Sequence, residues 1–171
     1  MIVRALAGFA ALLCVVTPPP AAATGGVGLE QTSEVAYDHE ATHTSLARLD
    51  ALGADIVALV PFVWQRTPAA TDPIPGGSVS AAQLRAGITA AKRAGMTVVV
   101  KPHVWVPGTW AGAVDPGGQA AWRAWFDAYA AALMPYVHAA RDAGADVFFV
   151  GTELRRSLDH TDAWRRVIAR V

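Results

Sequence analysis

Short hydrophobic runs and longer amphipathic stretches alternate along this chain. Three of the runs share a pattern in which a glycine is closely followed by an uninterrupted apolar segment: 53–60, 95–100 and 144–150. A glycine at such a point suits the left-handed residue that ends a helix. An apolar segment without polar breaks suits a strand that is buried on both faces, as in a parallel sheet. We therefore predict three helix-to-strand transitions, preceded by a weaker first strand over 28–32.

Each gap between the predicted strands has room for one helix. Ser80 and Gln83 form a capping box at the start of the second of these helices. Trp122 and Trp125 lie on the apolar stripe of the third, where we expect them in the core, and Pro135 is expected to kink or interrupt that helix. The four predicted helices occupy 44–52, 80–94, 118–143 and 161–171.

Alternating strands and helices with right-handed crossovers allow an open doubly wound sheet or a (β/α)₈ barrel. No glycine-rich phosphate loop follows the first strand, so a dinucleotide-binding fold has no support. The loops 61–79 and 103–118 are long and rich in Pro, Gly and Trp, whereas the loops at the opposite strand ends are short. This asymmetry favours a barrel with its function at one mouth. We predict an α/β fold of the (β/α)₈ TIM-barrel type. Only the first four βα units are present, a half barrel, because a complete barrel typically has about 250 residues.

The N-terminal segment is similar to a secretory signal. Arg4 precedes a hydrophobic core over 5–16 that is too short to span a bilayer, and Ala21-Ala22-Ala23 offers a cleavage site. We expect a signal peptide over 1–23, cleavage near Ala23 and a secreted protein with one domain over 24–171. The single cysteine, Cys14, lies within the signal, so the mature chain is expected to have no disulfide.

Charge and composition exclude several classes of partner. The 14 Lys and Arg residues balance the 14 Asp and Glu residues, which gives no basis for binding nucleic acid or an anionic membrane surface. Hydrophobic residues make up 53% of the chain. No second run of about 20 apolar residues follows the signal, so we expect no contact with the membrane after signal cleavage.

Polar and aromatic side chains cluster where the predicted strands end. Glu153 follows the last predicted strand and would lie at its C-terminal end, where parallel α/β folds place ligands and catalytic groups. Sugar rings have apolar C–H faces that stack on tryptophan and hydroxyl groups that need polar partners. The candidates for stacking are Trp64, Trp105 and Trp110, and the polar candidates are Lys101, His103 and Gln65.

Structural roles are alternatives for several of these residues. Glu153 could cap the next helix or pair with Arg155, and His103 could be a buried structural histidine. Lys101 ends an apolar run, where a buried ammonium needs a partner. A metal-binding role for His103 lacks a second His or Asp at ligand spacing, so we expect no metal and no cofactor.

Four motifs occur in one order along the chain: 101–106 (Lys-Pro-His-Val-Trp-Val), 108–110 (Gly-Thr-Trp), 122–129 (Trp-Arg-Ala-Trp-Phe-Asp-Ala-Tyr) and 150–154 (Val-Gly-Thr-Glu-Leu). Together they resemble glycoside hydrolase family 113, a family of retaining β-mannanases within a large clan of (β/α)₈ glycosidases. The resemblance covers about 28–171 and includes 72–75. It implies hydrolysis of a β-1,4-linked polysaccharide or oligosaccharide, with Glu153 as the acid/base. The substrate-binding residues would be Trp64, Lys101, His103, Trp105, Trp110 and Thr152.

The chain departs from the family pattern at two points. Thr152 stands where most members of the clan have an asparagine that holds the sugar 2-hydroxyl. The nucleophile follows the seventh strand in the clan, and no carboxylate of this chain occupies such a position. We therefore expect the N-terminal half of an endo-β-1,4-mannanase, a fragment that is inactive alone and self-associates through exposed strand edges. The alternatives are a non-catalytic glycan-binding module and another β-glycanase of the same clan.

Overall fold

The structure is a computed structural model that describes residues 25–31 and 35–171. The predicted signal peptide over 1–23, with Cys14, lies outside these residues. The main sheet has four parallel strands in the order β1-β2-β5-β7, with these bounds: β1 (Gly25–Leu29), β2 (Ala54–Leu59), β5 (Thr97–Val100) and β7 (Val147–Phe148). Parallel strands joined by helices confirm the predicted α/β class.

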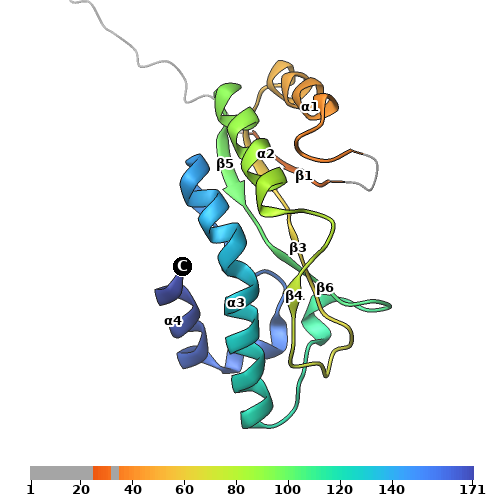
Figure 1. Cartoon of the computed structure of the whole chain (residues 1–171), viewed down its shortest axis with the longest axis vertical. Coiled ribbons are helices and arrows are strands. Elements are labelled where there is room, and N and C mark those ends of the chain that lie inside the picture. The colour runs from red at the N-terminus through yellow and green to blue at the C-terminus, as the bar shows by residue number, and fades with distance from the viewer. Residues whose placement is uncertain (1–24, 32–34) are drawn as a thin grey trace, which may run out of the picture.

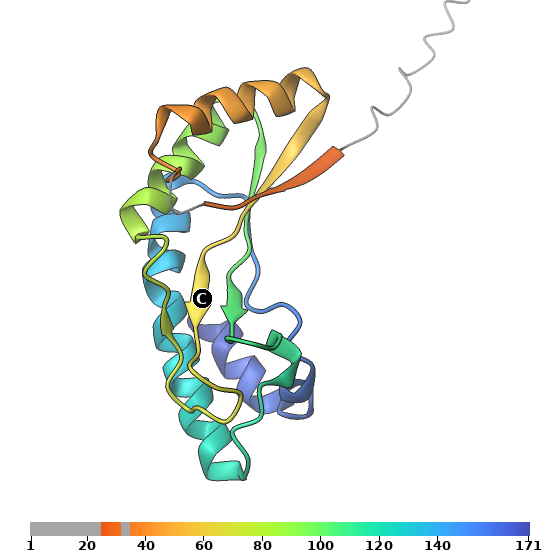
Figure 2. The same cartoon turned by 90° about the vertical axis from the view of Figure 1, so that its right-hand side faces the viewer.

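Three helices connect the strands of this sheet, and a fourth follows the last strand and packs against the third. In the described part of the chain they are α1 (Glu40–Ala51), α2 (Ala81–Arg93), α3 (Gln119–Ala143) and α4 (Thr161–Arg170), with the short 3₁₀ helices η1 (Ala111–Ala113) and η2 (Arg155–Asp159). Figures 1 and 2 show α2 and α3 together on one side of the strands. Val57, Leu59, Val98 and Val100 are completely buried on this side. The core therefore lies between sheet and helices, as in one wall of a barrel.

The helices largely follow the sequence pattern. Ser80 and Gln83 form both hydrogen bonds of the capping box at the start of α2. The first helix begins at Glu40 rather than near residue 44, because the His39 side chain accepts a hydrogen bond from the Ala41 N–H and caps it there. Of the two outcomes predicted at Pro135, a kink or an interruption, the interruption is wrong, since α3 continues as one helix through Pro135. Pro135 is exposed, so water can satisfy the carbonyl that loses its partner.

The glycine of each repeated segment ends a helix in the left-handed conformation, as predicted. The φ angles are +83° at Gly53, +79° at Gly95 and +76° at Gly144. In two copies an aspartate follows and ties its strand to the previous one. Asp55 accepts a hydrogen bond of 2.9 Å from the Gly25 N–H, which helps β1 begin at Gly25 rather than at the predicted residue 28. Asp146 plays the same part between β7 and β5.

Asp146 accepts hydrogen bonds from the Lys92 ammonium at 2.8 Å and from the Val98 N–H at 2.7 Å. The hydrogen bond from Lys92 has the largest effect and the one from Val98 the next largest. Together they hold the pKa of the Asp146 carboxyl below its ordinary value.

Buried tyrosines satisfy backbone groups at the carboxyl ends of the strands. The Tyr37 hydroxyl donates to the Leu29 carbonyl at 2.7 Å and accepts from the Val60 N–H at 3.0 Å. Burial raises the pKa of Tyr37 to about 12. Tyr129 on α3 donates to the Val150 carbonyl at 3.0 Å, and burial raises its pKa as well. These bonds fix the strand ends on which the predicted site residues lie.

The predicted loops after β2 and β5 contain a second, smaller sheet. Its strands are β3 (Phe62–Trp64), β4 (Ile74–Pro75) and β6 (His103–Trp105), in the order β4-β3-β6. The Lys101 N–H donates to the Leu59 carbonyl at 2.9 Å, and the His103 N–H donates to the Pro61 carbonyl at 3.0 Å. The pairing of β2 with β5 therefore continues through Pro61 and Pro102 into β3 and β6.

The last strand is shorter and more exposed than the sequence suggests. The apolar run 147–150 predicted a strand buried on both faces, but β7 ends at Phe148, and Val147 and Phe149 are 43% and 45% exposed. Among the described strands β7 pairs only with β5, so one edge and part of one face lack a neighbour. The same holds at the other edge, where β1 pairs only with β2.

Candidate active site

Four of the predicted site residues lie on one face of the small sheet or beside it. Alternation along β3 and β6 buries Val63 and Val104 in the core. It turns Trp64 and Trp105, which are 42% and 49% exposed and are register partners, to the opposite face. His103 shares this face, and its Nδ1 lies 3.4 Å from the Thr152 hydroxyl at the end of the last strand. The structure thus brings Trp64, His103, Trp105 and Thr152 to one side of the molecule.

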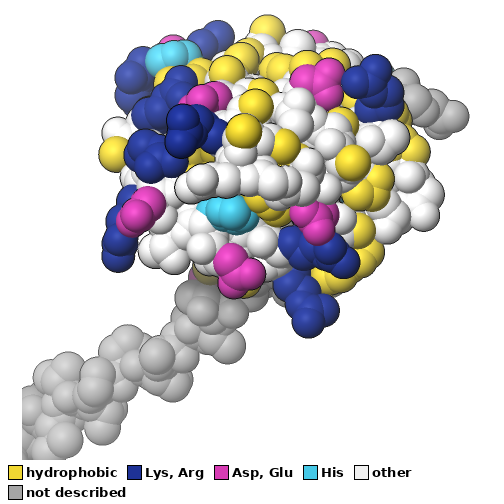
Figure 3. All heavy atoms as spheres, turned by 90° about the horizontal axis from the view of Figure 1, so that it is seen from below, with side chains coloured by type: hydrophobic (Ala, Val, Ile, Leu, Met, Phe, Trp, Pro, Cys, Tyr) yellow, Lys and Arg dark blue, Asp and Glu magenta, His cyan; other side chains and the backbone are white. Residues whose placement is uncertain are grey.

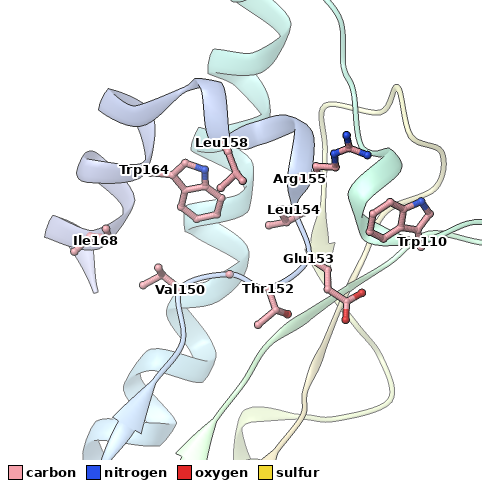
Figure 4. Close-up of a pocket in the computed structure, with 10 residues that line it drawn as sticks. Trp110, Val150, Thr152, Glu153, Leu154, Arg155, Leu158, Trp164 and Ile168 are labelled. Carbon is pink, nitrogen blue, oxygen red and sulfur yellow. The ribbon is translucent and has the colours of Figure 1, made fainter.

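Glu153 follows Thr152 in an unusual backbone conformation. Its φ is +61°, and among the described residues it is the one non-glycine residue with a positive φ. This region costs an L-residue about 1–2 kcal/mol and is often occupied at functional sites. The side chain is exposed, and Figure 4 shows its carboxylate directed away from Trp164 and Ile168, on the side of Trp110.

A buried set of hydrogen bonds holds the turn that carries Glu153. The Ser157 hydroxyl donates to the Leu154 carbonyl at 2.6 Å, and the Trp164 indole N–H donates to the Ser157 carbonyl and hydroxyl, both at 3.1 Å. Ser157 is 1% exposed. We call these three residues the Leu154–Ser157–Trp164 network. It connects η2 and α4 to the residue next to Glu153.

The glycine before this turn is fixed by packing. A Cβ atom at Gly151 would lie 2.7 Å from the Trp164 ring, so the ring occupies the space that a larger side chain would need. Trp164 also packs edge-on against Phe126 of α3, with ring centroids 5.3 Å apart. The backbone at Gly151, two residues before Glu153, is therefore closely packed against the Trp164 ring.

Glu153 lies at a cavity of about 420 Å³ (Figure 4). Most of the lining is apolar, and Glu153 is the one carboxylate among the described residues that contribute to it: Trp110, Val150, Gly151, Thr152, Leu154, Arg155, Leu158, Trp164 and Ile168. Trp110 is 51% exposed, and its ring lies so close over Gly112 that no Cβ would fit there. The cavity thus offers an aromatic surface beside a solvent-accessible carboxylate.

Two of the predicted polar residues have different surroundings from those expected. Lys101 is half-buried, and its side chain forms no ion pair within the described part of the chain. Gln65 is completely buried, accepts from the Trp125 indole N–H at 2.7 Å and donates to the Thr67 carbonyl at 2.9 Å. The expectation that Gln65 contacts a sugar is wrong, because its amide joins the loop after β3 to α3.

The other acidic residues near this end of the molecule have structural contacts. Asp115 forms an ion pair of 2.5 Å with Arg156 and accepts from the Gly117 N–H, so it links the loop after β6 to η2. Asp159 lines a different cavity, between the first turns of α3 and α4. No described carboxylate other than Glu153 lines the Glu153 cavity.

Sequence reasoning missed Ser157 and Trp164. Trp164 had a detectable signal, since it is an aromatic residue in the last predicted helix, whereas Ser157 lies in an unremarkable polar stretch.

Residues 25–31 and 35–171 contain no group of three or more His, Cys, Asp or Glu side chains arranged to hold a metal ion. They also include no helix that is both long and apolar enough to cross a bilayer. Figure 3, which views the molecule from below, shows basic, acidic and hydrophobic side chains interspersed.

Comparisons with known proteins agree with this geometry. The solved chains that resemble this one include the β-mannanase AaManA from Alicyclobacillus acidocaldarius in complex with ManMIm, at 26% identity and a TM-score of 0.76. A second β-1,4-mannanase structure is 25% identical with a TM-score of 0.74, and a third, a complex, is 23% identical with a TM-score of 0.73.

Each comparison covers 86% of this chain but only 49–50% of the solved chain, so the present chain spans about half their length. No match was found among curated proteins. The sequence profile described as Glycoside Hydrolase Family 113 matches residues 29–171, which include the four strand ends and Glu153. The chain therefore belongs to glycoside hydrolase family 113.

Proposed function

We propose that this chain supplies the acid/base side of the active site of a retaining endo-β-1,4-mannanase, with Glu153 as the acid/base. The observation that carries the proposal is the position of Glu153, after the carboxyl end of the last strand, exposed at a cavity that Trp110 also lines. Membership of the family supports glycoside hydrolysis, and the β-1,4-mannanase structures that this chain resembles support mannan as the substrate.

The chemistry follows from a carboxyl group that changes its protonation state. Protonated Glu153 donates its proton to the glycosidic oxygen as the bond to the anomeric carbon breaks. A second carboxylate forms the new bond to that carbon, which gives a glycosyl–enzyme intermediate. Ionised Glu153 then takes a proton from the water that displaces this carboxylate. The two carboxyl groups of a retaining pair lie about 5–5.5 Å apart.

The second carboxylate is proposed to come from the part of the barrel that this chain does not form. Glu153 lacks a carboxylate neighbour in its cavity among the described residues, and Asp115 is engaged by Arg156. Without a nucleophile the glycosyl intermediate cannot form. We therefore expect the 171-residue chain to show no hydrolysis by itself.

The remaining candidates are proposed to bind the sugar. The Thr152 hydroxyl, close to His103 Nδ1, is the nearest neighbour of Glu153 that could contact the sugar 2-hydroxyl. Lys101 would reach a hydroxyl farther from the bond, and Trp64, Trp105 and Trp110 would stack on sugar rings.

The test compares the chain alone with a chimera in which the second half of the AaManA barrel follows Val171. We expect no release of reducing sugar from β-1,4-mannan by the chain alone, and hydrolysis with retention by the chimera. Glu153→Gln should lower kcat of the chimera by about 10²-fold or more. Asp127→Asn, at an exposed position of α3, is the matched control. Hydrolysis by the chain alone, or a chimera indifferent to Glu153→Gln, would contradict the proposal.

A non-catalytic glycan-binding module is the second candidate, favoured by the three exposed tryptophans. It predicts that the natural polypeptide binds mannan but does not hydrolyse it, even when the complete barrel is present.

Export is proposed from the 1–23 segment, and N-terminal sequencing of the secreted protein should give a start near Thr24. A product that retains Met1 would argue against export.

A further inference from the structure

The Glu153 cavity has walls from two distant parts of the chain. Trp110 belongs to the loop 106–118 between β6 and α3, which we call the Trp110 loop. Glu153 belongs to the segment 149–154 between β7 and η2, which we call the Glu153 turn. Both segments lie outside the strands, so the distance between Trp110 and Glu153 depends on contacts between the two segments.

Asp115 connects the Trp110 loop to η2, which directly follows the Glu153 turn. One oxygen of its carboxylate pairs with the Arg156 guanidinium at 2.5 Å, and the other accepts a hydrogen bond from the Gly117 N–H at 3.1 Å. We propose that Asp115 is a positioning residue, whose carboxylate fixes the Trp110 loop relative to the Glu153 turn. This inference rests on the proposed function, because it assumes that Glu153 is the acid/base.

The Trp110 loop is compact between Trp110 and Asp115. The Ala113 N–H donates to the Trp110 carbonyl at 3.0 Å. The Val114 N–H donates to the Ala111 carbonyl at 3.1 Å, and both of these residues are 1% exposed. This short stretch, which contains η1, is therefore held as one unit. A displacement of Asp115 would displace Trp110 as well.

The backbone of Asp115 is itself fastened to a third segment. Its N–H donates to the Pro68 carbonyl at 2.8 Å, in the loop after β3. The buried Gln65 amide donates to the same carbonyl at 3.2 Å and accepts from the Trp125 indole N–H of α3. Because its backbone is already ordered, Asp115 pays less conformational entropy when it pairs with Arg156.

Arg156 is held on the side of Glu153. It lies in η2 within the Leu154–Ser157–Trp164 network, whose hydrogen bonds hold the residue that follows Glu153. The two 3₁₀ helices, η1 and η2, also contact each other. A displacement of Arg156 would therefore be passed to Glu153 through the short segment between them.

The exposure of the ion pair separates a positioning role from a role in stability. The side chains of Arg156 and Asp115 are 59% and 39% exposed, and exposed ion pairs contribute little to the free energy of unfolding. In contrast, a displacement of about 1 Å in a reacting group can lower a rate by about 10²-fold. Loss of the pair should therefore disturb the cavity much more than the stability of the chain.

The first test is NMR spectroscopy of the 171-residue chain. Its two reporters are the Trp110 indole N–H signal and the backbone coupling that depends on the φ of Glu153. Asp115→Asn removes the charge but can still accept from the Gly117 N–H. We expect this variant to shift the Trp110 signal and to move the Glu153 coupling toward an averaged value, while the midpoint of urea denaturation stays nearly unchanged.

Variants of the partner and a matched control accompany this measurement. Arg156→Gln should reproduce the effects of Asp115→Asn, whereas Arg156→Lys keeps the charge and should stay closer to the wild type. Asp162→Asn is the control, because it removes an exposed carboxylate that pairs with Arg165 inside α4. It should change neither reporter.

The second test measures kcat/KM in the chimera with the second half of the AaManA barrel. Asp115→Asn should lower kcat/KM for β-1,4-mannan by about tenfold, because the acid is displaced from the glycosidic oxygen. A dinitrophenyl β-mannobioside has a leaving group that departs without a proton, so its kcat/KM should be nearly unchanged. A merely structural defect would lower both values equally.

Unchanged NMR reporters in Asp115→Asn, or equal losses on the two substrates, would overturn the proposal. If Asp115→Asn fails to fold, Arg156→Gln decides by the same two measurements. A wild-type chimera that does not hydrolyse mannan would refute the proposed catalysis, whereas the NMR reporters would still decide whether Asp115 fixes the two walls of the cavity.

Discussion

At the scale of single residues, the backbone at Glu153 is the most informative feature. A glutamate at φ +61° is less stable than a glycine in the same place, because its Cβ crowds the neighbouring carbonyl. The strained carboxylate is kept where a reacting group would be needed, which is the usual relation between strain and function. The strain itself can be measured without any assay of activity.

Replacing Glu153 by glycine should therefore stabilise the chain. Relief of strain outweighs the larger entropy of an unfolded glycine, so we expect Glu153→Gly to exceed Glu153→Ala by about 0.5–1 kcal/mol in the free energy of unfolding. Urea denaturation of both variants measures this difference. Gly144→Ala is the inverse control, since Gly144 has a φ of +76° and alanine there should destabilise. Equal stability of the two Glu153 variants would show that the turn relaxes freely.

At the scale of elements, the Leu154–Ser157–Trp164 network fastens the Glu153 turn to η2 and α4. Ser157→Ala removes the hydroxyl bonds, and Trp164→Phe keeps an aromatic ring but removes the N–H donor. Because the two side chains share one network, we expect a coupling free energy of about 1 kcal/mol in a double-mutant cycle.

Ser45→Ala is the control for this cycle, since the Ser45 hydroxyl donates to the Ala41 carbonyl within α1, away from the Leu154–Ser157–Trp164 network. The double variant should be less destabilised than the sum of the two single changes. Strict additivity would mean that the network is not cooperative. The backbone couplings that report the φ of Glu153 should also move toward an averaged value in Ser157→Ala, and should remain unchanged in Ser45→Ala.

The contact between β5 and β7 has a predicted dependence on pH. The pKa of Asp146 is lower in the folded chain than in the unfolded one, so the folded state binds fewer protons in this range. The stabilisation by Asp146 is therefore present above its unfolded pKa and is lost as the pH falls through the lower, folded value. The stability difference between the wild type and Asp146→Asn should be largest near neutral pH and smallest in strong acid.

Urea denaturation at neutral pH and at pH values below the ordinary value of 3.8 tests this directly. Asp142→Asn is the control, because Asp142 pairs with Arg85 at a surface where both side chains are about half exposed. Such exposed pairs contribute little. A stability difference for Asp146→Asn that persists in acid would show that the amide, rather than the lost charge, causes the effect.

Local rules predicted most of these elements. Capping at Ser80 and the left-handed glycines at 53, 95 and 144 depend on a few neighbouring residues, so they are visible in the sequence. The continuation of the strands through Pro61 and Pro102 was missed, because proline usually ends a strand unless its missing N–H is not needed for pairing. The burial of Gln65 was missed as well, since its partner Trp125 is 60 residues away in sequence.

At the scale of the whole molecule, the two edge strands of the main sheet each have one edge without a described neighbour. Among the described strands β1 and β7 each have one neighbour, and Val147 and Phe149 are exposed at the β7 end. Unpaired strand edges with apolar side chains favour pairing with another chain. We propose that the chain self-associates when it is expressed alone.

Size-exclusion chromatography over a range of concentrations should show species larger than a monomer. Phe149→Lys should shift the distribution toward the monomer, because a charge at this edge opposes pairing. Leu52→Lys is a matched control, as Leu52 is 83% exposed and lies away from the open edge. A monomer at all concentrations, or an equal effect of both substitutions, would contradict self-association through β7.

The free edge of β7 also makes this strand a reporter of strand pairing. Among the described strands, none receives the amide groups of β7 that point away from β5, so their hydrogens should exchange with solvent at rates close to those of an unfolded chain. A neighbouring strand, from another copy or from the rest of a barrel, would slow this exchange by occupying the same N–H groups. Deuterium uptake along 146–150 would therefore report, without any substrate, whether this edge of the sheet has acquired a neighbouring strand.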